Sequence, residues 1–220
     1  MFDVFYILTA FFKILCYSII GIYLLKQWIR LEKKYASDLP FLMGIAVLFL
    51  IPGTIIDITV MTNSIGPCLL YNFRYSLDLI GSQLIFGAIL SVWMSGKVKL
   101  RYSIVISTSI LFTIIFLLMP TDILLLDITS AMITLPTLLS LIITFMFTYF
   151  TKRLTNVHGL LISIATLTVI AASIIRPFLK ITAVSPIMPY GLSWITNLIL
   201  ISGWLIMYYG LISKPGYINA

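Results

Sequence analysis

Apolar residues fill seven long runs of this 220-residue chain, separated by short clusters of charged and turn-forming residues. An α-helix needs about 20 apolar residues to cross a bilayer, and each run comes close to that length. The runs are continuously apolar, unlike the alternating pattern of membrane β-strands. Because lipid offers no hydrogen-bond partners to the backbone, the pattern predicts helices. The expected spans are residues 4–25, 40–61, 68–94, 102–119, 128–150, 159–181 and 190–211.

The composition agrees with a chain that lies almost entirely in a membrane. Hydrophobic residues make up 61% and charged residues only 10%, with a mean hydropathy of +1.14. The predicted fold class is therefore an all-α integral membrane protein, a bundle of seven transmembrane helices forming one domain over residues 1–220. The first run follows Asp3 rather than a basic segment and continues almost to Lys26, so we expect it to be retained rather than cleaved as a signal.

The basic residues predict an orientation, because they gather after every second span. By the positive-inside rule the N-terminus lies outside and the C-terminus in the cytoplasm, most simply of a cell (plasma) membrane. The net charge of +7 is then mainly a topology signal and no indication of nucleic acid. Residues 120–127 are expected to form a short acidic turn on the outer side. Basic residues on the inner side are Lys26, Arg30, Lys33, Lys34, Lys97, Lys99, Arg101, Lys152, Arg153 and Lys214, and the stretch 30–34 is expected to meet anionic lipid headgroups.

Charges inside the spans are the candidate functional residues, since a charge is costly in lipid. In the predicted orientation all of them fall in the outer half of the membrane. Spacing of four places Arg74 and Asp78 on one helix face, where they can pair, and places Arg176 beside Lys180, where they repel or share an anion. Four positive against two negative groups would suit an anionic ligand, a lipid headgroup or carboxylates of a neighbouring subunit. The six residues are Lys13, Asp57, Arg74, Asp78, Arg176 and Lys180.

Each of these charges also has a structural interpretation. Arg176 and Lys180 could reach outer phosphates by extending their side chains, and Asp57 could lie at headgroup level. Arg74 with Asp78 could be a salt bridge that only joins helices. Lys13 lies near the middle of its span and requires a partner, for which Asp78 is the best candidate.

Two amides accompany the charges. Gln83 and Asn197 also lie in spans, and with Lys13 and Asp78 they could line one outward-opening cavity. Buried amides more often join helices to each other. Kinks at Pro52-Gly53, Pro136 and Pro177 would shape such a cavity.

Catalytic, metal and cofactor motifs are absent from the sequence. It has one histidine, His158, and two cysteines without a CxxC spacing, so no haem, zinc or other cofactor site is expected. It has no HExxH, no GxSxG and no glycine-rich phosphate loop. We therefore expect a protein that is not an enzyme.

One short stretch resembles a known family. Arg74-Tyr75-Ser76-Leu77-Asp78 is similar to the Arg-Tyr-x-Asp-Trp stretch in the third helix of the microbial rhodopsins, which also have seven helices and an outer N-terminus. Here the aspartate comes one residue later and the tryptophan is missing. The seventh span has no lysine for a retinal Schiff base, so neither function nor cofactor is carried over.

Three classes of function remain open. A non-catalytic subunit of a larger membrane complex would explain short loops, missing catalytic groups and charges that await other subunits or lipids. A small-solute transporter or channel would explain the outer polar residues and kinked helices. A seven-helix sensor would signal through its basic cytoplasmic loops. We place the subunit first, the transporter second and the sensor third.

Overall fold

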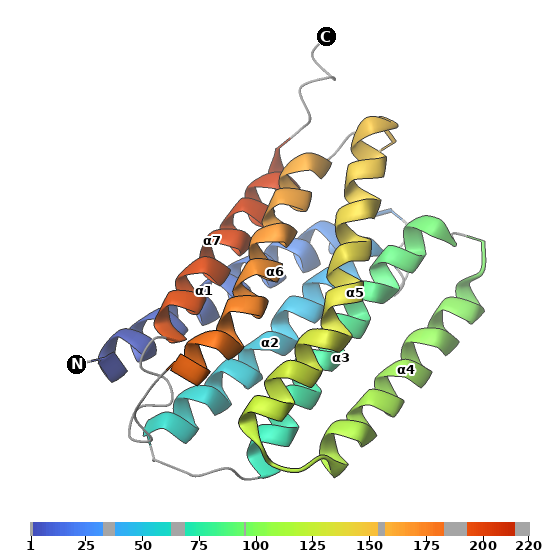
Figure 1. The fold of residues 1–220 in the computed structure, drawn as a ribbon. Coiled ribbons are helices and arrows are strands. Elements are labelled where there is room, and N and C mark those ends of the chain that lie inside the picture. Colours follow the sequence, from blue (N-terminus) through green and yellow to red (C-terminus); the bar gives the residue numbers. More distant parts are fainter. Residues whose placement is uncertain are drawn as a thin grey trace. The chain divides into compact units, whose positions relative to one another are not determined.

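The computed structural model describes residues 2–32, 38–62, 69–94, 96–153, 157–182 and 193–213. Within these ranges the chain is all-helical, with seven helices and no strand (Figure 1). By length and composition each helix can cross a membrane, which confirms the predicted fold class. The direction in which the helices cross stays a prediction. The helices are α1 (Phe2–Ile29), α2 (Leu39–Thr62), α3 (Leu69–Trp93), α4 (Val98–Leu118), α5 (Ile123–Phe150), α6 (Gly159–Thr182) and α7 (Ser193–Ile212).

Helix α5 begins five residues before the predicted position, at Ile123 instead of residue 128. The side chain of Asp122 accepts hydrogen bonds from the backbone N–H groups of Leu124 at 2.9 Å and Leu125 at 3.4 Å. This is how an N-cap satisfies the first N–H groups of a helix. The prediction that residues 120–127 form a turn is therefore wrong in its second half, and Asp127 lies inside the helix.

Helix α4 also begins early, at Val98 instead of residue 102. Arg101, which we expected in a loop, belongs to its first turn and is buried. In both cases a charge was mistaken for the edge of a span, because charge density alone does not reveal where helical hydrogen bonding starts.

The chain divides into two compact units, each described by itself below. Unit 1 comprises Met1–Thr9 and Leu138–Ala220, and unit 2 comprises Ala10–Thr137. Helices α6 and α7 belong to unit 1, and α2, α3 and α4 belong to unit 2. Helix α5 changes units after Thr137, directly beside its internal Pro136.

In unit 2, glycines allow α3 to pack closely against both α2 and α4. A Cβ atom on Gly81 would lie 3.1 Å from the carbonyl oxygen of Ala46 on α2. A Cβ on Gly87 would lie 3.0 Å from a methyl carbon of Val105 on α4. Small residues are the usual means by which membrane helices approach each other, since lipid provides no hydrophobic force between them.

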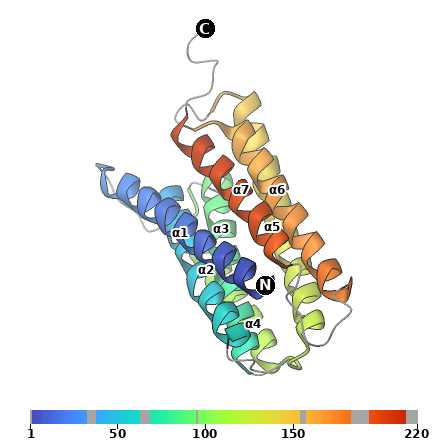
Figure 2. The same cartoon turned by 90° about the vertical axis from the view of Figure 1, so that its left-hand side faces the viewer.

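Unit 1 uses the same device between α6 and α7, which lie side by side (Figure 2). A Cβ on Gly203 of α7 would lie 3.2 Å from the carbonyl oxygen of Ala165 on α6. At the other end of the pair, the backbone N–H of His158 donates to the carbonyl oxygen of Gly210 at 2.7 Å. This bond satisfies a carbonyl near the end of α7 and holds the start of α6 against it.

Large apolar side chains remain exposed along the helices. Phe11 is 63% exposed, Leu118 80% and Phe150 70%. On a soluble protein such residues would form an aggregating surface, whereas on a membrane helix they face acyl chains. The exposed surface therefore agrees with a multi-pass membrane protein.

Gly159 offers a direct test of this close packing. A Cβ at this position would lie 2.5 Å from the carbonyl oxygen of Phe145, a backbone atom that cannot rotate away. We expect Gly159→Ala to lower stability by about 1–3 kcal/mol, the usual cost of overpacking. Thermal unfolding in detergent measures the effect, with Gly96→Ala as the matched control because nothing lies within 4 Å of a Cβ there. Equal melting temperatures for both variants would contradict the packing described for unit 1.

Candidate functional site

The guanidinium of Arg74 is the centre of the polar site in unit 2. From the second turn of α3 it contacts Asp57 of α2 with two nitrogens, Nε to Oδ1 at 3.0 Å and Nη2 to Oδ2 at 3.1 Å. At Nε the contact is ionic and not a well-aligned hydrogen bond. Its third nitrogen, Nη1, lies 2.9 Å from Oδ2 of Asp78, one turn further along α3. The predicted pairing of Arg74 with Asp78 is confirmed, and Asp57 joins it from a second helix.

Gly53 makes room for this ion network. A Cβ at Gly53 would lie 2.9 Å from Oδ1 of Asp78 and 3.8 Å from Cγ of Arg74. It follows Pro52, which lacks an N–H group and so cannot complete the hydrogen-bond ladder of α2. The Pro52-Gly53 pair therefore lies at the point where α2 contacts Arg74 and Asp78 of α3.

The two carboxylates differ in their access to the surroundings. The side chain of Asp57 is only 2% exposed, whereas that of Asp78 is 23% exposed. Burial strengthens an ion pair but makes the loss of one partner costly. Asp57 is thus the fixed counter-ion of Arg74, and Asp78 is the carboxylate that outside groups can approach.

A third carboxylate, on α5, lies beside the residue that follows Arg74 in α3. Asp127 of α5 is 5% exposed and accepts a hydrogen bond from the hydroxyl of Tyr75, the residue after Arg74. The Tyr75 ring also stacks on Phe116 of α4, with ring centroids 6.2 Å apart. The sequence pattern did not reveal this pair, because the charge of Asp127 favoured a turn. Asp122, an N-cap residue five positions earlier, is the signal for the early helix start.

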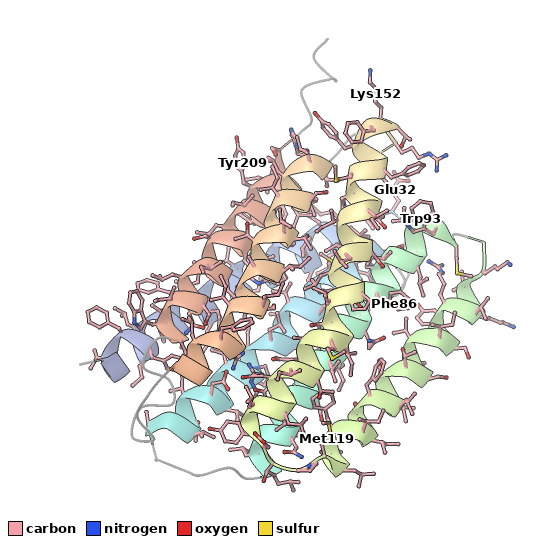
Figure 3. The ribbon with its side chains drawn as sticks, viewed as in Figure 1. Glu32, Phe86, Trp93, Met119, Lys152 and Tyr209 are labelled. Atoms are coloured by element: carbon pink, nitrogen blue, oxygen red, sulfur yellow. The ribbon has the colours of Figure 1, made fainter. Side chains whose placement is uncertain are left out.

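Asn72 joins α3 to the end of α4 at the same level. Its amide nitrogen donates to the carbonyl oxygens of Phe116 at 2.9 Å and Met119 at 2.8 Å, which the end of a helix leaves without partners. Its own carbonyl oxygen is buried without a hydrogen-bond partner. Figure 3 shows Met119 at one end of the α3–α4 pair and Trp93 at the other. The ion network thus belongs to the Met119 end of unit 2.

Lys13 is the second cation among the candidates of unit 2. It lies on α1 and is 4% exposed, so its ammonium group is buried as predicted. Asp78, the partner expected for Lys13, contacts Arg74, and its pairing with Lys13 stays a prediction. Together the candidates of unit 2 and Asp127 comprise two cations and three carboxylates: Lys13 and Arg74, and Asp57, Asp78 and Asp127. The predicted excess of four cations over two carboxylates counted Arg176 and Lys180, which belong to unit 1. The candidates of unit 2 are balanced by themselves, and Asp127 adds one carboxylate to them.

Gln83 and Asp78 face different helices. Its side-chain oxygen accepts a hydrogen bond from the hydroxyl of Thr108 on α4 at 2.8 Å. Asp78 lies against Gly53 of α2. Gln83 therefore joins α3 to α4, which is the structural alternative considered for it.

The remaining candidates belong to unit 1. Asn197 of α7 is 3% exposed, and its amide nitrogen donates to the hydroxyl of Thr9 on α1 at 3.3 Å. Arg176 of α6 is half-buried. Lys180 lies on α6, but its side chain is outside the described residues, so the expected repulsion from Arg176 stays a prediction. The described part of the chain contains no group of His, Cys, Asp and Glu residues that could hold a metal ion.

The ion network predicts a difference between two carboxylate variants. Asp57→Asn leaves a buried guanidinium with one contact out of three and should destabilise the protein by about 3–5 kcal/mol. Asp78→Asn keeps the two contacts to Asp57 and should cost about 1 kcal/mol or less, because Asp78 is partly exposed. Chemical or thermal unfolding in detergent measures both. A larger loss for Asp78→Asn would contradict the assignment of Asp57 as the fixed counter-ion.

No family model, no curated protein and no solved structure matches this chain. The helices and their polar contacts therefore carry the functional argument by themselves. They identify a multi-pass membrane protein with seven apolar helices and a buried ion network at one end of unit 2.

Proposed function

We propose that the protein is a non-catalytic, proton-handling transporter that works through the ion network of unit 2. The observation that carries this proposal is the balance of charges around Arg74. Its guanidinium already contacts two carboxylates, Asp57 and Asp78, and a third, Asp127, is buried on the neighbouring α5. We count Lys13, the buried cation of α1, with this group, so that one negative charge is in excess when every group is ionised.

An excess charge inside a membrane helix bundle is expensive. Low dielectric surroundings disfavour an ion that is not compensated, and such a group is neutralised by a proton or a bound counter-ion. Binding of one proton neutralises the excess negative charge of the cluster. Uptake and release of a proton would therefore switch the site between a neutral and a negative state. Ionisable residues within spans commonly form proton paths in pumps and transporters.

The buried contacts favour a proton over a larger cation. Asp57 is 1% exposed and Asp127 5%, so a hydrated metal ion has little access to them. The Tyr75 hydroxyl already donates a hydrogen bond to Asp127, and a hydroxyl–carboxylate contact is a link along which a proton can pass. The partly exposed Asp78 is the carboxylate through which a proton would enter.

Every element around the site contributes to its charge. Helix α1 provides Lys13, α2 provides Asp57, α3 provides Arg74, Tyr75 and Asp78, and α5 provides Asp127. The ionisable groups of α4 (Lys99, Arg101 and Tyr102) are in its first turns, at the Trp93 end of the unit. The proposed proton is therefore shared by groups of four helices.

A non-catalytic subunit of a larger membrane complex is the second candidate. Only 17% of the residues in the apolar segment of α4 are buried, against 56% in that of α3. A helix that is covered so little has free surface for another membrane protein as well as for lipid. The structure supports this candidate less than the sequence did. Arg74 contacts two carboxylates of its own chain, so it does not need carboxylates from a partner subunit. The sensor stays a prediction from the sequence.

Proton flux in proteoliposomes tests the proposal. Vesicles with the purified protein, a pH-sensitive dye inside and a K⁺ diffusion potential should acidify faster than empty vesicles. Asp78→Asn should lower the rate by about tenfold or more, because it removes the excess charge that binds the proton. Lys13→Met should change the rate as well, since it increases the excess of negative charge in the cluster.

The matched control is Glu32→Gln, which removes one negative charge from an exposed residue that follows α1. It should leave the rate unchanged. Flux equal to that of empty vesicles, or equal rates for Asp78→Asn and the wild type, would refute the proposal. Stoichiometric membrane partners after gentle purification, combined with absent flux, would favour the subunit.

A further inference from the structure

Arg101 is a buried cation at the opposite end of unit 2 from the ion network. It is 6% exposed in the first turn of α4. Arg101, Val105 and Thr108 follow each other at helical spacing, and the last two contact Gly87 and Gln83 of α3. Arg101 therefore lies on the face of α4 that packs against α3, in the first turn of α4. Figure 3 shows Trp93 at this end of the α3–α4 pair.

The guanidinium of Arg101 lacks a counter-ion among the residues that the structure describes. Its Nε atom is buried without a hydrogen-bond partner. Leaving a nitrogen of a buried guanidinium without a partner costs free energy. An arginine that stays charged in such a place calls for an anion from outside the chain.

The start of α4 supplies further groups that attract an anion. The backbone N–H groups of Val98, Lys99 and Leu100 precede the first intrahelical bond, which Arg101 donates to the carbonyl oxygen of Lys97 at 3.1 Å. Lys97, the residue before the helix, makes no side-chain cap. Free N–H groups and the positive end of the helix dipole together form an anion site. Side chains of a helix lean toward its N-terminus, which directs Arg101 to this same place.

We propose that Arg101 and the first turn of α4 bind a phosphate oxyanion, carried by an anionic lipid headgroup or present as free phosphate. The planar guanidinium matches two phosphate oxygens at once, and the backbone N–H groups can take a third. Lys97 and Lys99 are exposed beside it and add positive charge at the entrance. Trp93, 52% exposed at the end of α3, suits the level of lipid headgroups.

This site is independent of the proposed transport. Arg74 and Trp93 are 19 positions apart on α3, which corresponds to roughly 28 Å along the helix axis. The phosphate site is thus on the other side of the membrane from the ion network. In the predicted orientation this is the cytoplasmic leaflet, where anionic lipids and basic residues meet.

Native mass spectrometry and thermal unfolding test the site. The purified protein is mixed with phosphatidylglycerol or with phosphatidylcholine in detergent, and retained lipid is counted. In a separate arm without added lipid, inorganic phosphate is titrated while the melting temperature is followed. We expect Arg101→Met to weaken binding of the oxyanion by about tenfold or more, because the variant loses a bidentate charged hydrogen bond. Lys99→Met, the matched control, should weaken it by about twofold or less, because an exposed charge contributes little.

The arms distinguish the two sources of phosphate. Retained phosphatidylglycerol that depends on Arg101 supports a lipid headgroup, and stabilisation by inorganic phosphate that depends on Arg101 supports free phosphate. Equal losses for Arg101→Met and Lys99→Met would show unspecific charge attraction and overturn the site, as would absence of binding in both arms.

A third variant keeps the test valid if Arg101→Met does not fold. Arg101→Lys retains the charge but loses the planar fork, and we expect several-fold weaker binding of the same oxyanion. In the wild type, free phosphate should also displace retained phosphatidylglycerol, since both would occupy one site. Unchanged binding in Arg101→Lys together with no displacement would overturn the proposal.

Discussion

The contact on which unit 2 depends is the pairing of one guanidinium with two carboxylates in an apolar environment. Arg74 uses all three of its nitrogens on Asp57 and Asp78, so it joins α2 to α3 and neutralises itself within the chain. Taking these groups out of water is costly, and only close, well-oriented contacts compensate for it. Gly53 suits this arrangement, because a Cβ atom at its position would lie 2.9 Å from Oδ1 of Asp78 and would displace that carboxylate. The ion network and the close approach of α2 and α3 therefore support each other.

Unit 2 places polar groups at both ends of its central helix pair and keeps small residues between them. At one end, Asn72 and Tyr75 connect α3 to α4 and α5 beside the ion network. At the other end, Arg101 lies at the start of α4. Gly81 and Gly87 pack the middle of α3 against its neighbours. A proton site and an anion site would thus occupy opposite ends of one unit, with a tightly packed segment between them.

The sequence predicted the helices well and the site only in part, for identifiable reasons. Long apolar runs leave a helix as the only solution in lipid, so all seven helices were predicted, and helical spacing sufficed for the pair Arg74 and Asp78. Contacts between different helices were beyond reach, because spacing along one helix does not say which neighbour a side chain faces. The hydrogen bond of Tyr75 to Asp127 and the contact of Asp57 with Arg74 are of this kind.

The amino-acid sequence alone determined the membrane environment, the number of helices and the presence of costly charges within them. These properties depend on local composition and on the periodicity of one helix, which need no knowledge of neighbours. The balance of those charges was decided by tertiary packing. Asp127 and Arg101, which looked like loop residues, became buried once the helix starts and neighbours were in place. Burial is a property of several helices together, and it placed a further carboxylate beside the ion network and a further cation at the opposite end of unit 2.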